Sequence, residues 1–353
     1  MRLLPVLAAL LLVAGCGAEP PAATPFTRVD LPAGAVPTRI TAAGGDLLIG
    51  VSRDGKPGLL RYRDGNLGEV PVVPVTPYGQ VADWFSLAAR GDDVLAVGGK
   101  SGGAHMNVRW SVWRMKGGQL VEQPQKFSAF GGYGAGALVD GVYPTSGPLL
   151  VGVWQGATGG SDAALWTTDG TVWARQSSAG TPLESTRDSL KFPMSATTHG
   201  AEALISGWQL TGGKQQPVVW TVRDGKATIA TLPHAGRAAM AITVTCADTC
   251  AAAGRVDGKL AVWRQAGNTW RRVADVPDVP VGDHDRPVPP LGDTLVYSDR
   301  GNVRVATLGG DVRDAAGPTG VVTAVARVGD TTYVLAGPDG DGNNQTLWRA
   351  GRG

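Results

Sequence analysis

The chain has 353 residues, of which 43% are hydrophobic and 18% charged, so it can build the core of one large domain or two ordinary ones. Its 52 Gly and 24 Pro residues indicate frequent turns, while 11 Trp residues and many aliphatic clusters argue against a disordered chain. The net charge is +2 and no stretch concentrates Lys and Arg, which argues against a nucleic-acid partner.

The first 25 residues have the composition of an export signal followed by a linker. Arg2 precedes an apolar run over residues 3–13, which is too short to span a bilayer as a mature helix. The tetrapeptide VAGC at residues 13–16 resembles the lipobox of bacterial lipoproteins. This resemblance implies that residues 1–15 are a signal peptide that is removed, and that Cys16 becomes the acylated N-terminus. An ordinary secretory signal with a chance Cys is the alternative.

A lipid anchor at Cys16 would fix the location of the protein. Two or three acyl chains hold a protein stably on a membrane, because each buried CH₂ group contributes about 0.8 kcal/mol. Residues 16–25 then form the lipidated Cys and a Pro/Ala tether that lifts the following domain off the surface. We therefore expect a lipid-anchored protein on the extracytoplasmic face of the cell membrane.

An apolar-aromatic dipeptide recurs along the rest of the chain at intervals of roughly 50 residues. Its aromatic member falls at Tyr62, Trp113, Trp166, Trp220, Trp263 and Trp348. The last interval is close to two repeats of about 43 residues, which predicts a skipped unit near residues 303–307, where no aromatic residue stands. The pattern therefore predicts seven units. Six units of about 55 residues would fit the spacing less well.

A second marker precedes each aromatic one: an apolar strand that ends in a small residue, as in DLLIG (46–50), LLVGVW (149–154) and YVLAG (333–337). Another short strand and a tight turn lie ahead of it. Each unit thus reads as four short antiparallel strands, which is the composition of a β-propeller blade. One blade cannot bury both of its faces, so blades must stack around an axis.

The N-terminal segment can supply the strand that the last unit lacks. The seventh unit stops after its third strand, whereas FTRVDLP at residues 26–32 is a strand-like segment left over before the first unit. The N-terminal segment can supply the outer strand of the last blade and close the ring, which removes exposed edges. We predict an all-β fold, a seven-bladed propeller over residues 26–353 that forms a single domain.

Cys246 and Cys250 flank the turn between the first two strands of the fifth unit. A C-x₃-C pair can be half of a zinc site, but no second pair exists and no His is close in the sequence. Cross-strand residues of a hairpin lie at distances that a disulfide can bridge, and an exported protein meets an oxidising environment. A disulfide is the favoured prediction.

Candidate binding residues lie in the loops between the second and third strands, which open on the same side of the ring as the crossovers between blades. Such loops are the usual place of recognition in propellers. They carry Lys100, His105, Asp162, Lys214, Asp339, Asp341 and Asn343.

The last three of these residues stand at alternate positions, so their oxygens could wrap a calcium ion. The loop lacks the Gly and Glu of an EF-hand, however, and its composition also suits an ordinary turn. We expect no cofactor and no other metal.

Catalytic patterns are incomplete in this sequence. TTDGTVW (167–173) and AGNTW (266–270) resemble broken Asp-boxes of sialidase-type propellers, and TRITAAGG (38–45) resembles the opening of that family with Thr41 in place of Pro. The resemblance implies three arginines that clamp a carboxylate, with Arg39 as one candidate, and a nucleophilic Tyr–Glu pair with an acidic Asp. No residues can be assigned to that pair, and the Ser/His/Asp pattern of hydrolases is also missing.

Two functions follow from these observations. The first is a non-catalytic binding propeller that recognises a protein or a glycan at the cell envelope. The second is a glycan-acting enzyme with a degenerate sialidase-like signature. An enzyme would gather carboxylates and arginines at the mouth of the axis, whereas a binding module need not, so the arrangement of those residues discriminates between the two.

Overall fold

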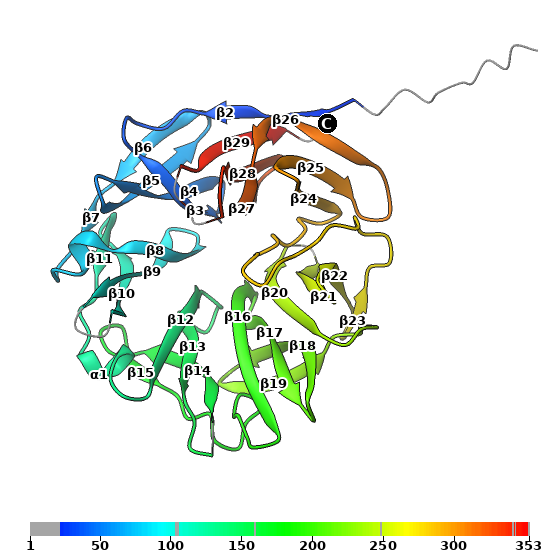
Figure 1. Cartoon of the computed structure of the whole chain (residues 1–353). Coiled ribbons are helices and arrows are strands. Elements are labelled where there is room, and N and C mark those ends of the chain that lie inside the picture. The colour runs from blue at the N-terminus through cyan, green and yellow to red at the C-terminus, as the bar shows by residue number, and fades with distance from the viewer. Residues whose placement is uncertain are drawn as a thin grey trace, which may run out of the picture.

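The computed structural model describes residues 22–102, 106–158, 160–247, 249–340, 342 and 344–351. Seven sheets surround a common axis, each with its first strand innermost, except in the sixth sheet (Figure 1). This is the predicted seven-bladed β-propeller. Among these residues, no helix is long and apolar enough to cross a membrane.

The strands follow the chain order in each blade. The first blade comprises β3 (Val36–Ala43), β4 (Asp46–Arg53), β5 (Lys56–Arg63) and β6 (Asn66–Val70). The second comprises β8 (Asp83–Arg90), β9 (Asp93–Gly102), β10 (Asn107–Lys116) and β11 (Gln119–Glu122), with β7 (Val72–Val73) at its edge. The third comprises β12 (Ala135–Val142), β13 (Leu149–Gln155), β14 (Ser161–Thr168) and β15 (Trp173–Arg175). Two short helices, η1 (Gly79–Val81) and α1 (Phe127–Phe130), lie in the crossovers that precede the second and third blades.

The remaining four blades complete the ring. The fourth blade comprises β16 (Ser189–His199), β17 (Glu202–Thr211), β18 (Lys214–Arg223) and β19 (Lys226–Thr231), and the fifth comprises β20 (Ala239–Cys246), β21 (Cys250–Val256), β22 (Lys259–Ala266) and β23 (Thr269–Arg272). The sixth comprises β24 (Thr294–Asp299), β25 (Asn302–Thr307) and β26 (Val312–Thr319) with β1 (Thr24–Pro25). The seventh comprises β27 (Val321–Val328), β28 (Thr331–Gly337) and β29 (Thr346–Gly351) with β2 (Thr27–Val29).

The N-terminal segment closes the ring as predicted. β2 pairs antiparallel with β29, with Arg28 opposite Trp348, and becomes the outer strand of the seventh blade (Figure 1). β1 adds a second contact, because it runs parallel to β26 of the sixth blade. The paired region therefore begins at Thr24, two residues before the predicted domain boundary and inside the predicted tether.

The sixth blade departs from the repeat. β24 corresponds to the second strand of the other blades, and β25 is the aromatic-free third strand expected near residues 303–307. The place of the first strand is taken by the connecting segment 273–293, which joins the strand pairing only at isolated bridges such as Leu291 to Thr294. Its Pro-rich sequence explains the irregularity, because Pro cannot donate to a strand ladder.

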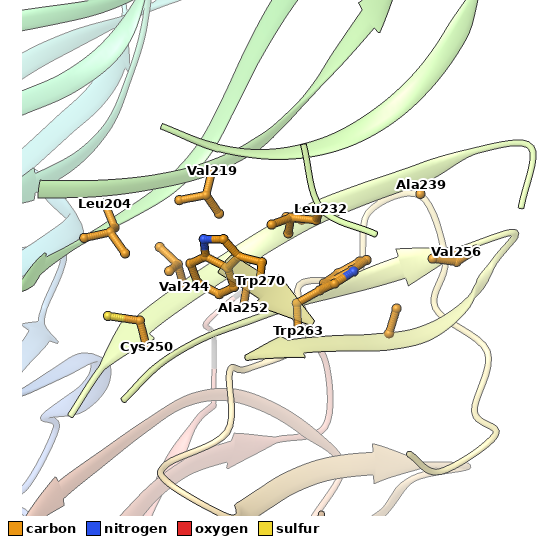
Figure 2. Close-up of a cluster of buried hydrophobic side chains, with 12 residues drawn as sticks. Leu204, Val219, Leu232, Ala239, Val244, Cys250, Ala252, Val256, Trp263 and Trp270 are labelled. Atoms are coloured by element: carbon orange, nitrogen blue, oxygen red, sulfur yellow. The ribbon is translucent and has the colours of Figure 1, made fainter. Parts of the chain in front are cut away.

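The recurring Trp residues pack one blade against the next. Trp263 of β22 is fully buried and contacts a cluster that includes Leu204 and Val219 of the preceding blade (Figure 2). Its indole N–H donates to the carbonyl of Pro233 in the incoming crossover at 2.7 Å. Trp220 makes the equivalent bond to Pro182. Each of these two Trp residues thus fills an interface between blades and holds the crossover that enters its own blade.

The predicted cysteine pair lies where the repeat placed it. Cys246 and Cys250 are directly opposite each other at the end of the β20–β21 hairpin and are joined as a disulfide.

An ion pair between the buried Asp46 and the exposed Arg63, at the first turn of the first blade, gives a prediction for acid stability. The Asp46 side chain is 3% exposed and accepts hydrogen bonds from Nε and Nη2 of Arg63 at 2.5 and 2.6 Å. The Arg63 hydrogen bonds, and after them the attraction of Arg63 and Arg61, lower the pKa of Asp46 against the opposing effect of burial. This stabilisation is present above the unfolded pKa of about 4 and is lost as pH falls through the lower folded value.

We therefore expect Asp46→Asn to lower the free energy of unfolding at pH 7 and to matter less at pH 3. Urea denaturation of both proteins at the two pH values measures this. An equal difference at both would contradict it. Glu69→Gln, which removes an exposed partner of Arg53, is the matched control and should have little effect at either pH.

Candidate functional site at the propeller axis

The first strands of six blades carry a β-bulge near the end where the crossover arrives. A bulge disrupts the strand ladder locally, so backbone groups of the bulged residue lose their ladder partners. The residues that follow the bulges are Arg39, Ser86, Asp140, Ser195, Thr243 and Ala324. The fold therefore presents one ring of side chains and bulge carbonyls around its axis.

Two arginines bind these bulge carbonyls. Arg39 donates through Nε to the Phe85 carbonyl of the neighbouring blade at 2.8 Å, and through Nη1 to the Thr38 carbonyl. Arg286 comes from the irregular segment 273–293 and donates to the Met194 carbonyl of the fourth blade at 2.7 Å. The fifth blade lies between Arg286 and Met194 in the order of the ring, so the Arg286 side chain extends inward past that blade.

One carboxylate accompanies the two arginines. Asp140 accepts hydrogen bonds from the Ser86 hydroxyl of the second blade and from the Ala196 N–H of the fourth, the latter at 2.9 Å. It thereby links the first strands of three consecutive blades. Burial raises the pKa of Asp140, while these hydrogen bonds and the charge of Arg286 oppose the rise.

The charges of Arg39, Arg286 and Asp140 do not sum to zero. Burial lowers the pKa of Arg39, and the charge of Arg286 lowers it further. Arg286 keeps contact with solvent, yet the surrounding strands remove enough water to lower its pKa as well. Among the described residues, no carboxylate lies within 4.0 Å of either guanidinium. We call Arg39, Asp140 and Arg286 the axial cluster; it carries one excess positive charge.

Segment 273–293 is fixed to the fifth blade by ion pairs, which explains how a region without a strand can position Arg286. Asp283 pairs with Arg255, whose side chain is largely buried. Asp293 pairs with Arg264, and Thr243 donates to the Pro287 carbonyl at 2.6 Å. These contacts stand on both sides of Arg286 along the chain and hold its backbone against the fifth blade.

Several large apolar side chains of the second and third blades are exposed. Most of the large exposed hydrophobic residues lie in one stretch of chain, residues 75–133, which forms the crossovers and the β9–β10 loop of the second and third blades. We call the following residues the aromatic rim: Tyr78, Phe85, Met106, Phe127 and Tyr133. Tyr133 is 98% exposed. Phe85 is also the bulge residue whose carbonyl accepts from Arg39, so this one member of the rim lies beside the axial cluster.

The predicted loop residues are distributed over four blades instead of forming one site. Lys100 ends β9 and pairs with Asp83 at 2.9 Å, and Lys214 begins β18 at an exposed turn. Asp339 is exposed, and its carbonyl accepts from Gln345. His105, Asp341 and Asn343 lie outside the described residues, so the calcium hypothesis stays a prediction.

Asp162 requires a correction. It was expected on an accessible loop, but it is 4% exposed and its carboxylate accepts from the Ser178 hydroxyl and from the Ser185 N–H. The carboxylate of Asp162, at the start of β14, thus accepts hydrogen bonds from the crossover that packs over it. Its role is to hold the entry into the fourth blade.

The Asp-box-like stretch of the third blade forms a local turn between β14 and β15. Asp169 accepts from the N–H groups of Thr171 and Val172 at 2.9 and 2.8 Å, and Trp173 is buried. The turn is therefore structural. The four glutamates of the propeller are bound elsewhere: Glu69 to Arg53, Glu122 to Val75 and Thr76, Glu184 to Gly180, and Glu202 to Arg223.

A cavity of about 290 Å³ lies between the third and fourth blades, away from the axial cluster. It is lined mainly by aliphatic and hydroxyl side chains such as Leu149, Leu165 and Thr167. It offers no gathering of charged groups, so the axial cluster is the stronger candidate for a functional site.

Comparison with known proteins supports the fold alone. No family model and no curated protein matches the sequence. Among solved structures, the chain is similar to YCF48 bound to D1 peptide, at 11% identity over 94% of this chain and 99% of that one, with a TM-score of 0.53. It is also similar to the β-propeller domain of Cps50 (Swd1) from Myceliophthora thermophila, at 10% identity over 92% and 99% of the two chains, with a TM-score of 0.58. Puromycin hydrolase matches at 14% identity and a TM-score of 0.58, over 93% of this chain and 55% of that one.

Proposed function

We propose that the protein is a lipid-anchored binding propeller on the extracytoplasmic face of the cell membrane, and that it holds a segment of an envelope protein across the aromatic rim and the axial cluster. The observation that carries the proposal is the excess positive charge of Arg39 and Arg286, with the exposed ring of Phe85 next to Arg39. The anchor rests on the VAGC sequence that ends at Cys16, which lies outside the described residues.

The chemistry of the axial cluster favours a monovalent carboxylate as the group that enters it. Guanidinium groups bind carboxylates through charge-assisted hydrogen bonds. One carboxylate would neutralise the cluster, whereas a phosphate dianion would leave a net negative charge beside Asp140. The aromatic rim supplies apolar contact for the residues next to that carboxylate. A peptide with a free C-terminus or an acidic side chain fits both surfaces.

A solved propeller of the same fold, YCF48, holds a peptide of D1. At 11% identity this supports the general capacity of the architecture and does not transfer the partner.

The first test is proximity labelling on intact cells with the full chain. We expect one envelope protein to be recovered repeatedly and to be lost with Cys16→Ser. Its recovery should fall at least tenfold with Arg39→Ala combined with Arg286→Ala, because each substitution removes a charge-assisted hydrogen bond worth about 1.5–3 kcal/mol. Arg300→Ala, at a 93% exposed side chain, is the matched control and should retain the partner. Equal recovery with the double variant would overturn the axial site.

A glycan-acting enzyme is the second candidate, because the axis does gather two arginines and one acid. Glycoside hydrolysis generally needs a pair of carboxylates about 5–10 Å apart. Asp140 is the one carboxylate of the axial cluster, and the four glutamates are bound in loops and turns. The observations therefore favour binding. Hydrolysis of fluorogenic sialosides by the full chain, abolished by Asp140→Asn, would reverse this order.

A further inference from the structure

The disulfide of the fifth blade has a histidine beside it that the sequence does not reveal. His199 ends β16 in the fourth blade, and Cys246 and Cys250 end the neighbouring hairpin of the fifth. β16 and β20 are the first strands of adjacent blades, so their terminal turns come together on the side of the ring away from the aromatic rim. One ligand atom from each of His199, Cys246 and Cys250 lies within 4.8 Å of the other two.

These three side chains are a soft-metal ligand set. Zinc binds thiolate sulfur at about 2.3 Å and imidazole nitrogen at about 2.0–2.1 Å, which places tetrahedral ligand atoms roughly 3.4–3.8 Å apart. In the disulfide the two sulfurs are bonded to each other, so reduction must first separate them to that distance, whereas a ring nitrogen of His199 already lies within 4.8 Å of both. The three ligands come from the end of β16, the end of β20 and the start of β21.

Glu202 completes the surroundings of the histidine. It stands opposite His199 in the β16–β17 hairpin, and its Oε2 is 3.9 Å from His199 Nδ1. A carboxylate beside a metal-bound imidazole orients the ring and raises its basicity. Glu202 also pairs with Arg223 at 2.9 Å, which holds it in place. A water molecule would complete the fourth position of a bound zinc ion.

The sulfurs differ in accessibility, which sets the order of events. Cys250 is 1% exposed, whereas Cys246 is partly exposed and the His199 side chain is 46% exposed. A dithiol reductant attacks the Cys246 sulfur, the S–S bond breaks, and Cys250 leaves as the thiolate. The second thiol of the reductant then displaces Cys246 and becomes a disulfide itself. The two electrons of the reductant end on Cys246 and Cys250.

We propose that reduction of the Cys246–Cys250 disulfide opens a zinc site made of these two thiolates and His199, with release of two protons when Zn²⁺ binds. The site is separate from the axial cluster and does not depend on the proposed binding function. It gives the first hairpin of the fifth blade two alternative cross-links, a disulfide under oxidising conditions and a metal after reduction.

Cobalt(II) is the probe, because thiolate–cobalt bonds give a charge-transfer band that carboxylate or imidazole ligands alone do not. We expect the full chain to bind one Co²⁺ with that band after reduction by a non-coordinating phosphine, to show no band when oxidised, and to release the cobalt when Zn²⁺ is added. His199→Ala should weaken Zn²⁺ binding by at least tenfold, and Glu202→Gln less. His234→Ala is the matched histidine control.

Three results would overturn the proposal: no thiolate band in the reduced protein, an unchanged Zn²⁺ affinity in His199→Ala, or the same band in the oxidised protein. Circular dichroism of each variant separates a lost ligand from a lost fold. Cys246→Ser combined with Cys250→Ser removes the disulfide and both thiolates, and must also remove the band.

Discussion

Removal of residues 24–31 is expected to destabilise the whole propeller and to expose it to aggregation. It removes β1 and β2, and with them the pairing of the outer strands of the sixth and seventh blades. The edges of β26 and β29 then lie open, and an open edge is a template for pairing with another chain. Thermal unfolding and size-exclusion chromatography of the full and deleted chains measure both effects.

Single substitutions in the same segment separate apolar packing from strand pairing. Phe26 is 9% exposed and packs in the cluster between the sixth and seventh blades. Phe26→Ala should lower the free energy of unfolding by about 3 kcal/mol. Arg28→Ala, which removes an exposed ion pair with Asp30, is the control and should change it by less than about 0.5 kcal/mol. A deleted chain that unfolds at the same temperature as the full one would show that ring closure contributes nothing.

The fold could be predicted because its strongest signal is local and repeated. An apolar residue followed by Trp, as at Trp166 and Trp220, marks the third strand of a blade, and a repeat counts blades without any knowledge of their contacts. The missing aromatic at β25 was inferred from spacing alone. The sixth blade's first strand could not be anticipated as irregular, because the repeat predicts a strand there and the Pro-rich segment 273–293 has no counterpart in the other blades.

The axial cluster was largely beyond sequence reasoning for a physical reason. Asp140 bonds residues 54 and 56 positions away, and Arg286 bonds a carbonyl 92 positions away. A bulge determines which side chain faces the axis, and a bulge shifts the register by one residue without a composition signal. Arg39 was noted only through a family resemblance. Aligning the first strands would have placed Ser86, Asp140 and Ser195 in one column, which is the signal that was available.

The proposed metal ligands could not be predicted from the sequence for the same reason, because they are far apart along the chain. His199 and Cys246 are far apart along the chain, and the statement that no histidine is close to the cysteine pair holds for the sequence but not for the fold. Adjacent blades bring equivalent turns together, so residues separated by about one repeat become neighbours. Motif searches that consider only short spacings miss such pairs in any propeller.

The second large effect is expected at the Trp that joins the fourth and fifth blades. Trp263 is fully buried, so Trp263→Ala leaves a cavity between the blades and should lower the free energy of unfolding by about 3–5 kcal/mol. Trp263→Phe keeps most of the apolar contact but leaves the Pro233 carbonyl without its indole donor, which should cost about 1–2 kcal/mol. Urea denaturation of the full chain measures both variants against the original protein.

Trp208 is the matched control because it lies outside the repeating position. It is half-buried and stacks on Phe192 at a ring separation of 3.8 Å, across the two innermost strands β16 and β17 of the fourth blade. Its replacement by Ala removes one stacked pair and leaves no enclosed cavity, so it should cost clearly less than Trp263→Ala. If the two alanine variants lost the same free energy, the repeating Trp would have no special role in joining blades, and the stability of the ring would depend on its strand pairing instead.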